Sequence, residues 1–150
     1  MPFFVPTGRA RVVAIVGRPI GQVRSPAVLN AELVRRRIDA VMIPVELPPH
    51  ALATFMTLLR SWSNAAGAVI TVPHKSAASG LVDTLTERAR LLGAANMVRR
   101  AVDGSLHGDM VDGLGFTAAL ARHAVDARGA CVAIFGGGAV GRALLLALAE

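Results

Sequence analysis

A glycine-rich segment near residue 140 has the residue types and spacing of a phosphate-binding turn. Glycines at 136, 138 and 141 match G-x-G-x-x-G between an apolar stretch typical of a strand and one typical of a helix. Glycine lets the backbone turn tightly and approach a pyrophosphate, which free N–H groups at the start of a helix bind. We therefore predict a dinucleotide-binding turn, formed by Gly136, Gly137, Gly138, Ala139, Val140 and Gly141. A glycine-rich turn without a ligand is the alternative.

Lys75 and Asp112 carry charges suited to acid–base chemistry, but each alone has an ordinary structural explanation. A lone lysine is usually a solvated surface residue, and an aspartate before Gly113 is typical of a helix N-cap. His74 has no serine or cysteine nucleophile in a matching motif, so we interpret it as structural. Lys75 and Asp112 gain a functional interpretation only from their wider context.

Three further polar residues lie where elements should begin or end. Ser25 before Pro26 predicts the N-cap of a helix, and the positive end of that helix could also hold a carboxylate. Thr71 is typical of a strand end and Asn96 of a turn, and each is equally compatible with contact to a ligand.

The elements that must position these residues alternate between strands and helices. Apolar and β-branched runs predict strands at residues 11–17, 40–45, 67–71, 96–100, 105–108 and 130–135. Apolar residues at helical spacing predict helices at 25–37, 48–59, 81–92, 112–125 and from the glycine segment to 150. The turn Asp103-Gly104 predicts a hairpin. The alternation indicates an α/β fold with a mostly parallel sheet and helices on both faces.

Size and composition argue against several other classes of protein. The 150 residues can bury one ordinary core, and the 53% that are apolar form no run long enough to cross a bilayer. The net charge of +6 is scattered, and with no Tyr and one Trp there are few stacking platforms for nucleic acid. The lone Cys131 excludes an internal disulfide framework, argues against zinc and fits the cytoplasm. We therefore expect no membrane, nucleic-acid or metal partner.

Four segments, in this order, resemble the shikimate/quinate dehydrogenase family. Residues 17–26 (GRPIGQVRSP) followed by Asn30 resemble its carboxylate-binding entrance, and residues 67–75 (GAVITVPHK) the segment that ends in its catalytic lysine. Residues 92–96 (LGAAN) are similar to the segment with a substrate-binding asparagine, and residues 108–116 (GDMVDGLGF) to the segment with the catalytic aspartate. With the glycine turn, the resemblance covers nearly the whole chain.

The resemblance implies an oxidoreductase that passes hydride between NADP or NAD and the ring hydroxyl of a shikimate- or quinate-like hydroxy acid. The catalytic pair would be Lys75 and Asp112. The substrate-binding positions would be Val23, Ser25, Thr71 and Asn96. A homodimer is compatible with this interpretation, but the sequence does not determine the oligomeric state.

The same resemblance divides the chain into three parts. Residues 1–111 would be a three-layer substrate-binding domain, 112–129 a connecting helix and linker, and 130–150 the first strand, glycine loop and helix of a Rossmann domain. We expect the chain to be the front part of a longer protein, because it lacks the second strand and the following residue that selects NAD or NADP. The last helix is also apolar almost all round and should be buried by further neighbours.

The sequence departs from the family pattern, mostly from polar to apolar. Val23 stands in place of a carboxylate-binding serine, and Val69 in place of an asparagine. The other departures are Gln22 and Leu29 for histidines, and Met97, Met110 and Val111 for polar residues. A substrate hydroxyl left unpaired in a buried site costs about 1–3 kcal/mol. Our hypothesis is a retained catalytic pair with an altered acid, which has fewer hydroxyls or a bulkier apolar part.

Two other functions remain open. A non-catalytic small-molecule-binding protein could derive from the same fold, and the changes at Val23, Val69 and Met110 favour it. A nucleic-acid-binding module rests on charge alone, and it predicts an affinity that falls steeply with salt.

Overall fold

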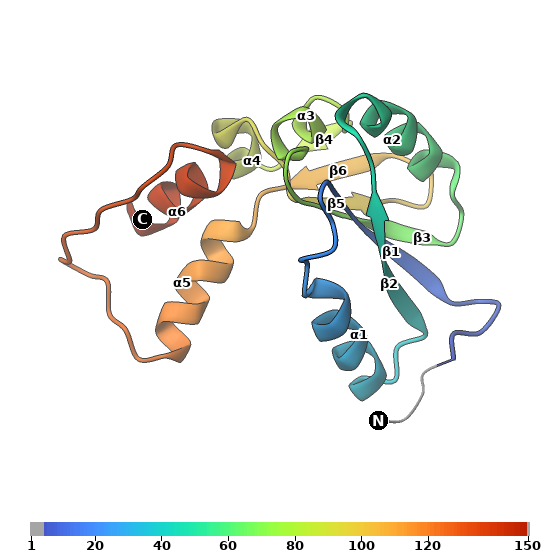
Figure 1. The fold of residues 1–150 in the computed structure, drawn as a ribbon, viewed down its shortest axis with the longest axis horizontal. Helices are drawn as coiled ribbons and strands as arrows, with labels where there is room; N and C mark the ends of the chain where they lie inside the picture. The colour runs from blue at the N-terminus through green and yellow to red at the C-terminus, as the bar shows by residue number, and fades with distance from the viewer. Residues whose placement is uncertain (1–4, 150) are drawn as a thin grey trace.

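The computed structural model describes residues 5–149, which form a six-stranded sheet with helices on both faces (Figure 1). The strands are β1 (Arg11–Gly17), β2 (Ala40–Glu46), β3 (Ala65–Ile70), β4 (Thr84–Leu85), β5 (Met97–Arg100) and β6 (Leu106–Asp109). The helices are α1 (Ser25–Arg35), η1 (Pro49–Ala51), α2 (Leu52–Ser61), α3 (Lys75–Ser79), α4 (Glu87–Leu92), α5 (Asp112–Arg122) and α6 (Ala139–Ala149). None of these helices has the length and apolar content that crossing a membrane requires.

The sheet is mostly parallel, as the alternation of elements predicts. Its order is β2-β1-β3-β5-β6-β4, with β1 parallel to β2 and β3, and β4 parallel to β6. The hairpin of β5 and β6 is confirmed, and β5 runs antiparallel to both β3 and β6. The carboxyl ends of β1, β3 and β6 and the amino end of β5 therefore lie at the same edge of the sheet. Thr71, Asn96 and Asp112 all lie within a few residues of this edge.

The main core lies between the sheet and α2. One face of α2 buries Leu52, Phe55, Met56 and Leu59 against sheet residues that include Val16 and Ile70. Full burial of one such side chain contributes about 1.5–3 kcal/mol, so this layer holds the sheet in place. The three-layer architecture is completed by α1 on the opposite face, next to β2 (Figure 1).

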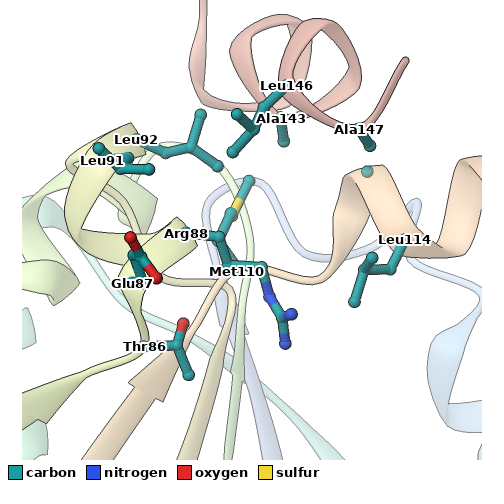
Figure 2. Close-up of a pocket in the computed structure, with 11 residues that line it drawn as sticks. Thr86, Glu87, Arg88, Leu91, Leu92, Met110, Leu114, Ala143, Leu146 and Ala147 are labelled. Carbon is teal, nitrogen blue, oxygen red and sulfur yellow. The ribbon is translucent and has the colours of Figure 1, made fainter. Parts of the chain in front are cut away.

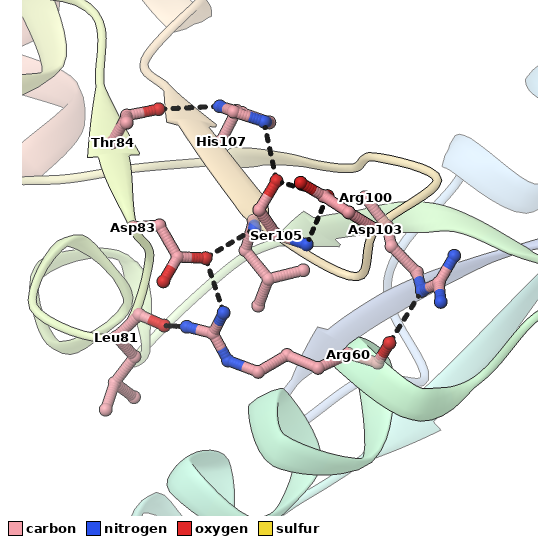
Figure 3. A network of polar contacts seen from close by, with 9 residues as sticks. Arg60, Leu81, Asp83, Thr84, Arg100, Asp103, Ser105 and His107 are labelled. Atoms are coloured by element: carbon pink, nitrogen blue, oxygen red, sulfur yellow. Dashed lines mark hydrogen bonds and ion pairs between the residues drawn. The ribbon is translucent and has the colours of Figure 1, made fainter.

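A polar network fixes the start of β6 to α2 and the segment before β4, away from the edge that carries Asp112 (Figure 3). Arg60 of α2 pairs with Asp83 and donates to the Leu81 carbonyl at 3.2 Å. Asp83 also accepts the backbone N–H of Leu106 at 2.7 Å. The hydrogen bonds from Arg60 and Leu106 lower the pKa of Asp83. The network therefore holds the β5–β6 hairpin at the end remote from the candidate site.

The predicted helix at residues 81–92 is correct only in its second half. Leu81 and Val82 pack against the main core, and Thr84 and Leu85 form β4 beside β6. The helix α4 begins only at Glu87, where Thr86 caps it by accepting the Ala89 N–H at 3.3 Å. Pairing with β6 thus overrides the local helical preference of the first half.

The predicted strand at residues 130–135 is wrong. A strand requires a neighbour to complete its backbone hydrogen bonds, and within residues 5–149 no strand lies beside this segment. Most of its side chains are exposed, including Phe135, which is 98% exposed. The helix that follows the glycine segment is confirmed as α6.

The predicted N-cap at Ser25 is also wrong. The helix α1 begins at Ser25 itself, with Arg24 at the cap position and no side-chain cap hydrogen bond. The backbone of Arg24 is already close to helical, so Ser25 lies inside the first turn. The side chain of Ser25 is therefore not needed to start the helix.

Candidate active site

Lys75 and Asp112 form an ion pair at the edge where the strands end. Lys75 is the first residue of α3, which follows β3, and Asp112 is the first residue of α5, which follows β6. The Nζ of Lys75 donates to Oδ2 of Asp112 at 2.6 Å. The two side chains are 11% and 25% exposed, so the pair is largely shielded but can be reached from solvent. Residues 37 positions apart in the sequence are thereby brought into direct contact.

Asn96 holds the second oxygen of the Asp112 carboxylate. Its Nδ2 donates to Oδ1 of Asp112 at 2.7 Å, while its Oδ1 accepts the Val111 N–H at 2.9 Å. Asn96 is only 6% exposed, and its backbone bonds to both Ile70 and Asp109. The asparagine predicted to contact the substrate therefore also orients the aspartate.

His74 is a buried structural residue in this arrangement, as the sequence indicates. It is 1% exposed, and its Nε2 lies 2.9 Å from the carbonyl oxygen of Leu47. A carbonyl can only accept, so Nε2 carries the proton and donates. The ring thus ties the residue before Lys75 to the segment that follows β2.

The other predicted substrate positions lie on segments that leave β1 and β3 at the same edge. The N–H of Thr71 bonds to the Val16 carbonyl at 2.8 Å, and its methyl group occupies the space where a side chain at position 17 would lie. Val23 is half-buried in the segment after β1, and Ser25 is exposed at the start of α1. The structure records no hydrogen bond from the side chain of Thr71 or Ser25 within residues 5–149.

An apolar strip runs beside the ion pair. Val69 of β3 lies directly opposite Met97 of β5, on the sheet face away from α2. Met97 follows Asn96 in sequence, and Val111 precedes Asp112. Met97 and Val111 also line a cavity of about 540 Å³ on that face. Three of the departures from the family pattern are therefore close together.

Met110 does not belong to that strip. It is 1% exposed and packs in a second cluster with Leu92 of α4 and Ala143 of α6. Figure 2 shows these residues around a pocket of about 330 Å³ between α4, α5 and α6. The expectation that Met110 changes the substrate pocket is wrong, because this side chain, directly after β6, packs against α4 and α6.

The predicted dinucleotide turn is tightly packed between Gly136 and Gly141 and open at Gly137 and Gly138. Gly136 has a φ of 110°, and a side chain at Gly141 would collide with the Gly136 carbonyl, so both positions require glycine. Side chains at Gly137 and Gly138 would meet nothing within 4 Å, which leaves open space at the start of α6. This geometry suits the close approach of a pyrophosphate to backbone N–H groups.

Asp109 at the end of β6 is held by two residues of the α4 segment. Arg88 donates from Nε to Oδ1 of Asp109 at 2.8 Å and from Nη2 to Oδ2. Thr86 also donates to Oδ1, at 2.6 Å. Burial raises the pKa of Asp109, but the hydrogen bonds from Arg88, Thr86 and the Met110 N–H outweigh burial and lower the pKa overall. This network fixes the strand end three residues before Asp112.

Comparison with known proteins identifies the family. The family profile described as "Shikimate dehydrogenase substrate binding domain" matches residues 15–98. The chain belongs to the shikimate dehydrogenase family. Shikimate dehydrogenase (NADP(+)) of Rhodospirillum rubrum is 40% identical over 147 residues, which cover 96% of this chain and 51% of that protein. The corresponding enzyme of Geobacter metallireducens is 36% identical over 145 residues. The chain thus spans about half the length of the curated relatives it matches.

Solved structures of other proteins have the same fold. Shikimate 5-dehydrogenase of Thermus thermophilus, in complex with shikimate, has a TM-score of 0.87 and 28% identity, covering 93% of this chain and 52% of that chain. The ligand-free 5-ketofructose reductase of a Gluconobacter strain has a TM-score of 0.85 and 29% identity, covering 95% of this chain and 50% of that chain. Relatives of similar fold therefore carry names for different substrates.

Two features of the site were missed in the sequence. Lys75 is the single lysine of the chain, and the other 15 basic residues counted in the net charge are arginines. Arginine stays protonated, whereas a lysine amine can lose its proton, so this composition could have marked position 75. Arg142, directly after the glycine segment, bonds to Gly137 and to Leu92 of α4. No local pattern indicates that second contact.

The pair of Asp109 and Arg88 should make stability depend on pH. Folding lowers the pKa of Asp109 below its usual value of 3.8, so its contribution is present above that pH and is lost as the pH falls through the folded pKa. We expect Asp109→Asn to lower the free energy of unfolding near neutral pH by about 1 kcal/mol or less, since the pair is partly exposed. Urea unfolding measures this free energy for both proteins, and the difference between Asp109→Asn and wild type should be smaller at about pH 3 than near neutral pH. An equal difference at both pH values would contradict the role of this carboxylate.

Proposed function

We propose that this chain provides the catalytic pair, the substrate-binding domain and the dinucleotide turn of an NADP-dependent dehydrogenase. Its substrate would be a shikimate- or quinate-like acid, oxidised at a ring hydroxyl. The observation that carries the proposal is the contact of Lys75 Nζ with Asp112 Oδ2 at 2.6 Å, at the strand edge of a chain in the shikimate dehydrogenase family.

The pair is arranged to bind a hydroxyl group and move its proton. In the oxidative direction the unprotonated amine of Lys75 can accept the proton of the hydroxyl group, while the contact with Asp112 keeps Nζ in place. As hydride leaves the carbon, this proton moves to Lys75 Nζ, and in the reverse direction the resulting ammonium returns it to the carbonyl oxygen. Acid–base catalysis of this kind contributes about 10²–10⁴-fold to the rate. Asn96 contributes by keeping Oδ1 of Asp112 in a fixed direction.

The glycine turn fits the diphosphate of a nicotinamide dinucleotide. The open space at Gly137 and Gly138 leaves backbone N–H groups accessible at the first turn of α6. When bound, the nicotinamide ring accepts the hydride in the oxidative direction. The names of the relatives in Rhodospirillum and Geobacter specify NADP, and we propose NADP rather than NAD for this chain on that basis.

The apolar strip indicates which acid the site would prefer. Val69, Met97 and Val111 offer no hydrogen bonds to ring hydroxyls, and Val23 offers none to a carboxylate. A buried hydroxyl without a partner is unfavourable, whereas apolar ring carbons gain about 25 cal/mol per Å² on burial. We therefore propose an acid with fewer hydroxyls, or with a bulkier apolar part, than shikimate.

The division of the chain remains part of this proposal. All six strands end by Asp109, which supports a substrate domain at residues 1–111. The segment 112–129, which contains α5, would connect this domain to a dinucleotide-binding part that begins at 130–150. The exposed single Cys131 suits a reducing compartment, and we propose the cytoplasm.

Lys75→Arg is the most informative substitution for the catalytic pair. Arginine retains the charge and can still pair with Asp112, but it cannot deliver or take up a proton. We expect turnover to fall by about 10²-fold or more, with the dissociation constant of the acid nearly unchanged. Lys75→Ala should lose turnover to a similar extent and should also raise the dissociation constant of the acid. The measurement is absorbance of reduced nicotinamide in the full-length protein, with shikimate, quinate and simpler ring hydroxy acids.

Ser76→Ala provides the matched control, because Ser76 is the next residue of α3 and its side chain is exposed. It should retain the wild-type rate. Normal turnover in Lys75→Arg would exclude Lys75 as the proton carrier. Binding of an acid without any turnover by the wild-type protein, with both NADP and NAD, would favour a binding protein instead.

Val23→Ser tests the altered specificity. A hydroxyl at this half-buried position should bind the carboxylate of shikimate and lower its KM by about tenfold, which corresponds to about 1.4 kcal/mol. Val28→Ser, on an exposed position of α1, is the matched control and should leave KM unchanged. An unchanged KM for shikimate in Val23→Ser would show that Val23 lies outside the substrate site.

A further inference from the structure

Arg142 connects the glycine turn to a helix of the substrate domain. It lies in the first turn of α6, where its Nη1 donates to the Gly137 carbonyl at 3.1 Å. Its Nη2 donates to the carbonyl of Leu92, the last residue of α4, at 3.0 Å. One guanidinium group therefore joins Leu92 to Gly137, two residues that are 45 positions apart in the sequence.

The Leu92 carbonyl is a suitable acceptor for a cation. It is one of the carbonyls at the C-terminal end of α4, which have no partner in the next turn of the helix. Gly93 adopts a left-handed conformation and ends α4, and the N–H groups that follow satisfy the carbonyls of Ala89 and Arg90. The negative end of the helix dipole also favours a positive charge there. Arg142 thus completes the end of α4 from another part of the chain.

A short path leads from this contact to the catalytic pair. From Leu92 the chain runs through Gly93 to Asn96, which donates to Oδ1 of Asp112. The end of α4 therefore lies four residues before the residue that orients the aspartate. The guanidinium of Arg142 links the opposite end of this path to the dinucleotide turn.

A second contact places α6 next to Asp112. Gly113 follows Asp112, and a side chain there would collide with the carbonyl of Ala143, the residue after Arg142. The Cβ of Ala147 would lie only 2.8 Å from such a side chain. Figure 2 shows Ala143 and Ala147 on the side of α6 that faces the substrate domain. Two consecutive residues of α6 are thus in contact with α4 and with the first turn of α5.

We propose that Arg142 is a positioning residue that couples the dinucleotide turn to the Asn96–Asp112 hydrogen bond. Its bridge sets the spacing between the bound nicotinamide and the proton-transfer pair. This role rests on the proposed function, because it requires a dinucleotide at the glycine turn. It depends on the planar, forked geometry of the guanidinium, which reaches two carbonyls at once, and not on positive charge alone.

The test compares Arg142→Met and Arg142→Lys in the full-length protein. Methionine removes both donors, and lysine retains the charge but presents a single ammonium. We expect both variants to raise the dissociation constant of NADPH by about tenfold, measured by nicotinamide fluorescence. The KM for NADP should rise and kcat should fall in both, while the dissociation constant of the acid, measured without dinucleotide, stays at the wild-type value. Arg128→Met, which removes an exposed ion pair with Asp126, is the matched control and should change none of these quantities.

The outcomes separate this inference from the proposed function. Wild-type kinetics in Arg142→Met would overturn the positioning role. Wild-type kinetics in Arg142→Lys, with altered kinetics in Arg142→Met, would show that the positive charge is sufficient and that the two-carbonyl bridge is not needed, which also overturns the proposal. Equal weakening of acid and dinucleotide would indicate general damage to the fold and would also overturn it, and circular dichroism would detect such damage. Absence of NADPH binding by the wild-type protein would contradict the proposed function itself.

Discussion

The carboxylate of Asp112 accepts a hydrogen bond on each oxygen, from Lys75 on one side and from Asn96 on the other. A partly buried charge of this kind is stable only when its partners satisfy it, because the loss of hydration costs several kcal/mol. The three residues begin or precede α5, α3 and β5, so their contact requires the sheet order that brings these ends together. Other supports, including the His74 contact to Leu47 and the Arg88–Asp109 pair, fix the segments that lead into it.

The antiparallel strand β5 is what completes the site. In a sheet of parallel strands alone, the edge at the carboxyl ends would receive residues that follow strands, such as Thr71 and Asp112. Because β5 runs the opposite way, Asn96, which precedes its strand, reaches the same edge. Its backbone carbonyl accepts the Ile70 N–H, its own N–H bonds to Asp109, and its amide holds Asp112. The residue thus joins β3, β6 and α5 at one point.

The sequence predicts elements with a strong apolar pattern, because their packing depends on their own side chains. β1, α2 and the β5–β6 hairpin are of this kind, and so is the glycine turn, whose φ of 110° at Gly136 requires its residue type. Features that depend on contacts between residues far apart in the sequence could not be predicted from the local sequence pattern. Thr84 and Leu85 join the sheet instead of a helix, Met110 packs toward α6, and Arg142 reaches Leu92, all through tertiary contacts. Pairing of Lys75 with Asp112 came from the family resemblance, since each residue alone is ordinary.

The central claim is that Lys75 and Asp112 act as one proton-transfer unit. A double-mutant cycle on kcat with Lys75→Met, Asp112→Asn and the combined variant tests it most directly. We predict that each single variant loses about 10²-fold or more and that the double variant loses little beyond the larger single loss, as residues acting as a unit do. If the two losses instead multiply, the residues act independently, and the unit described here does not exist.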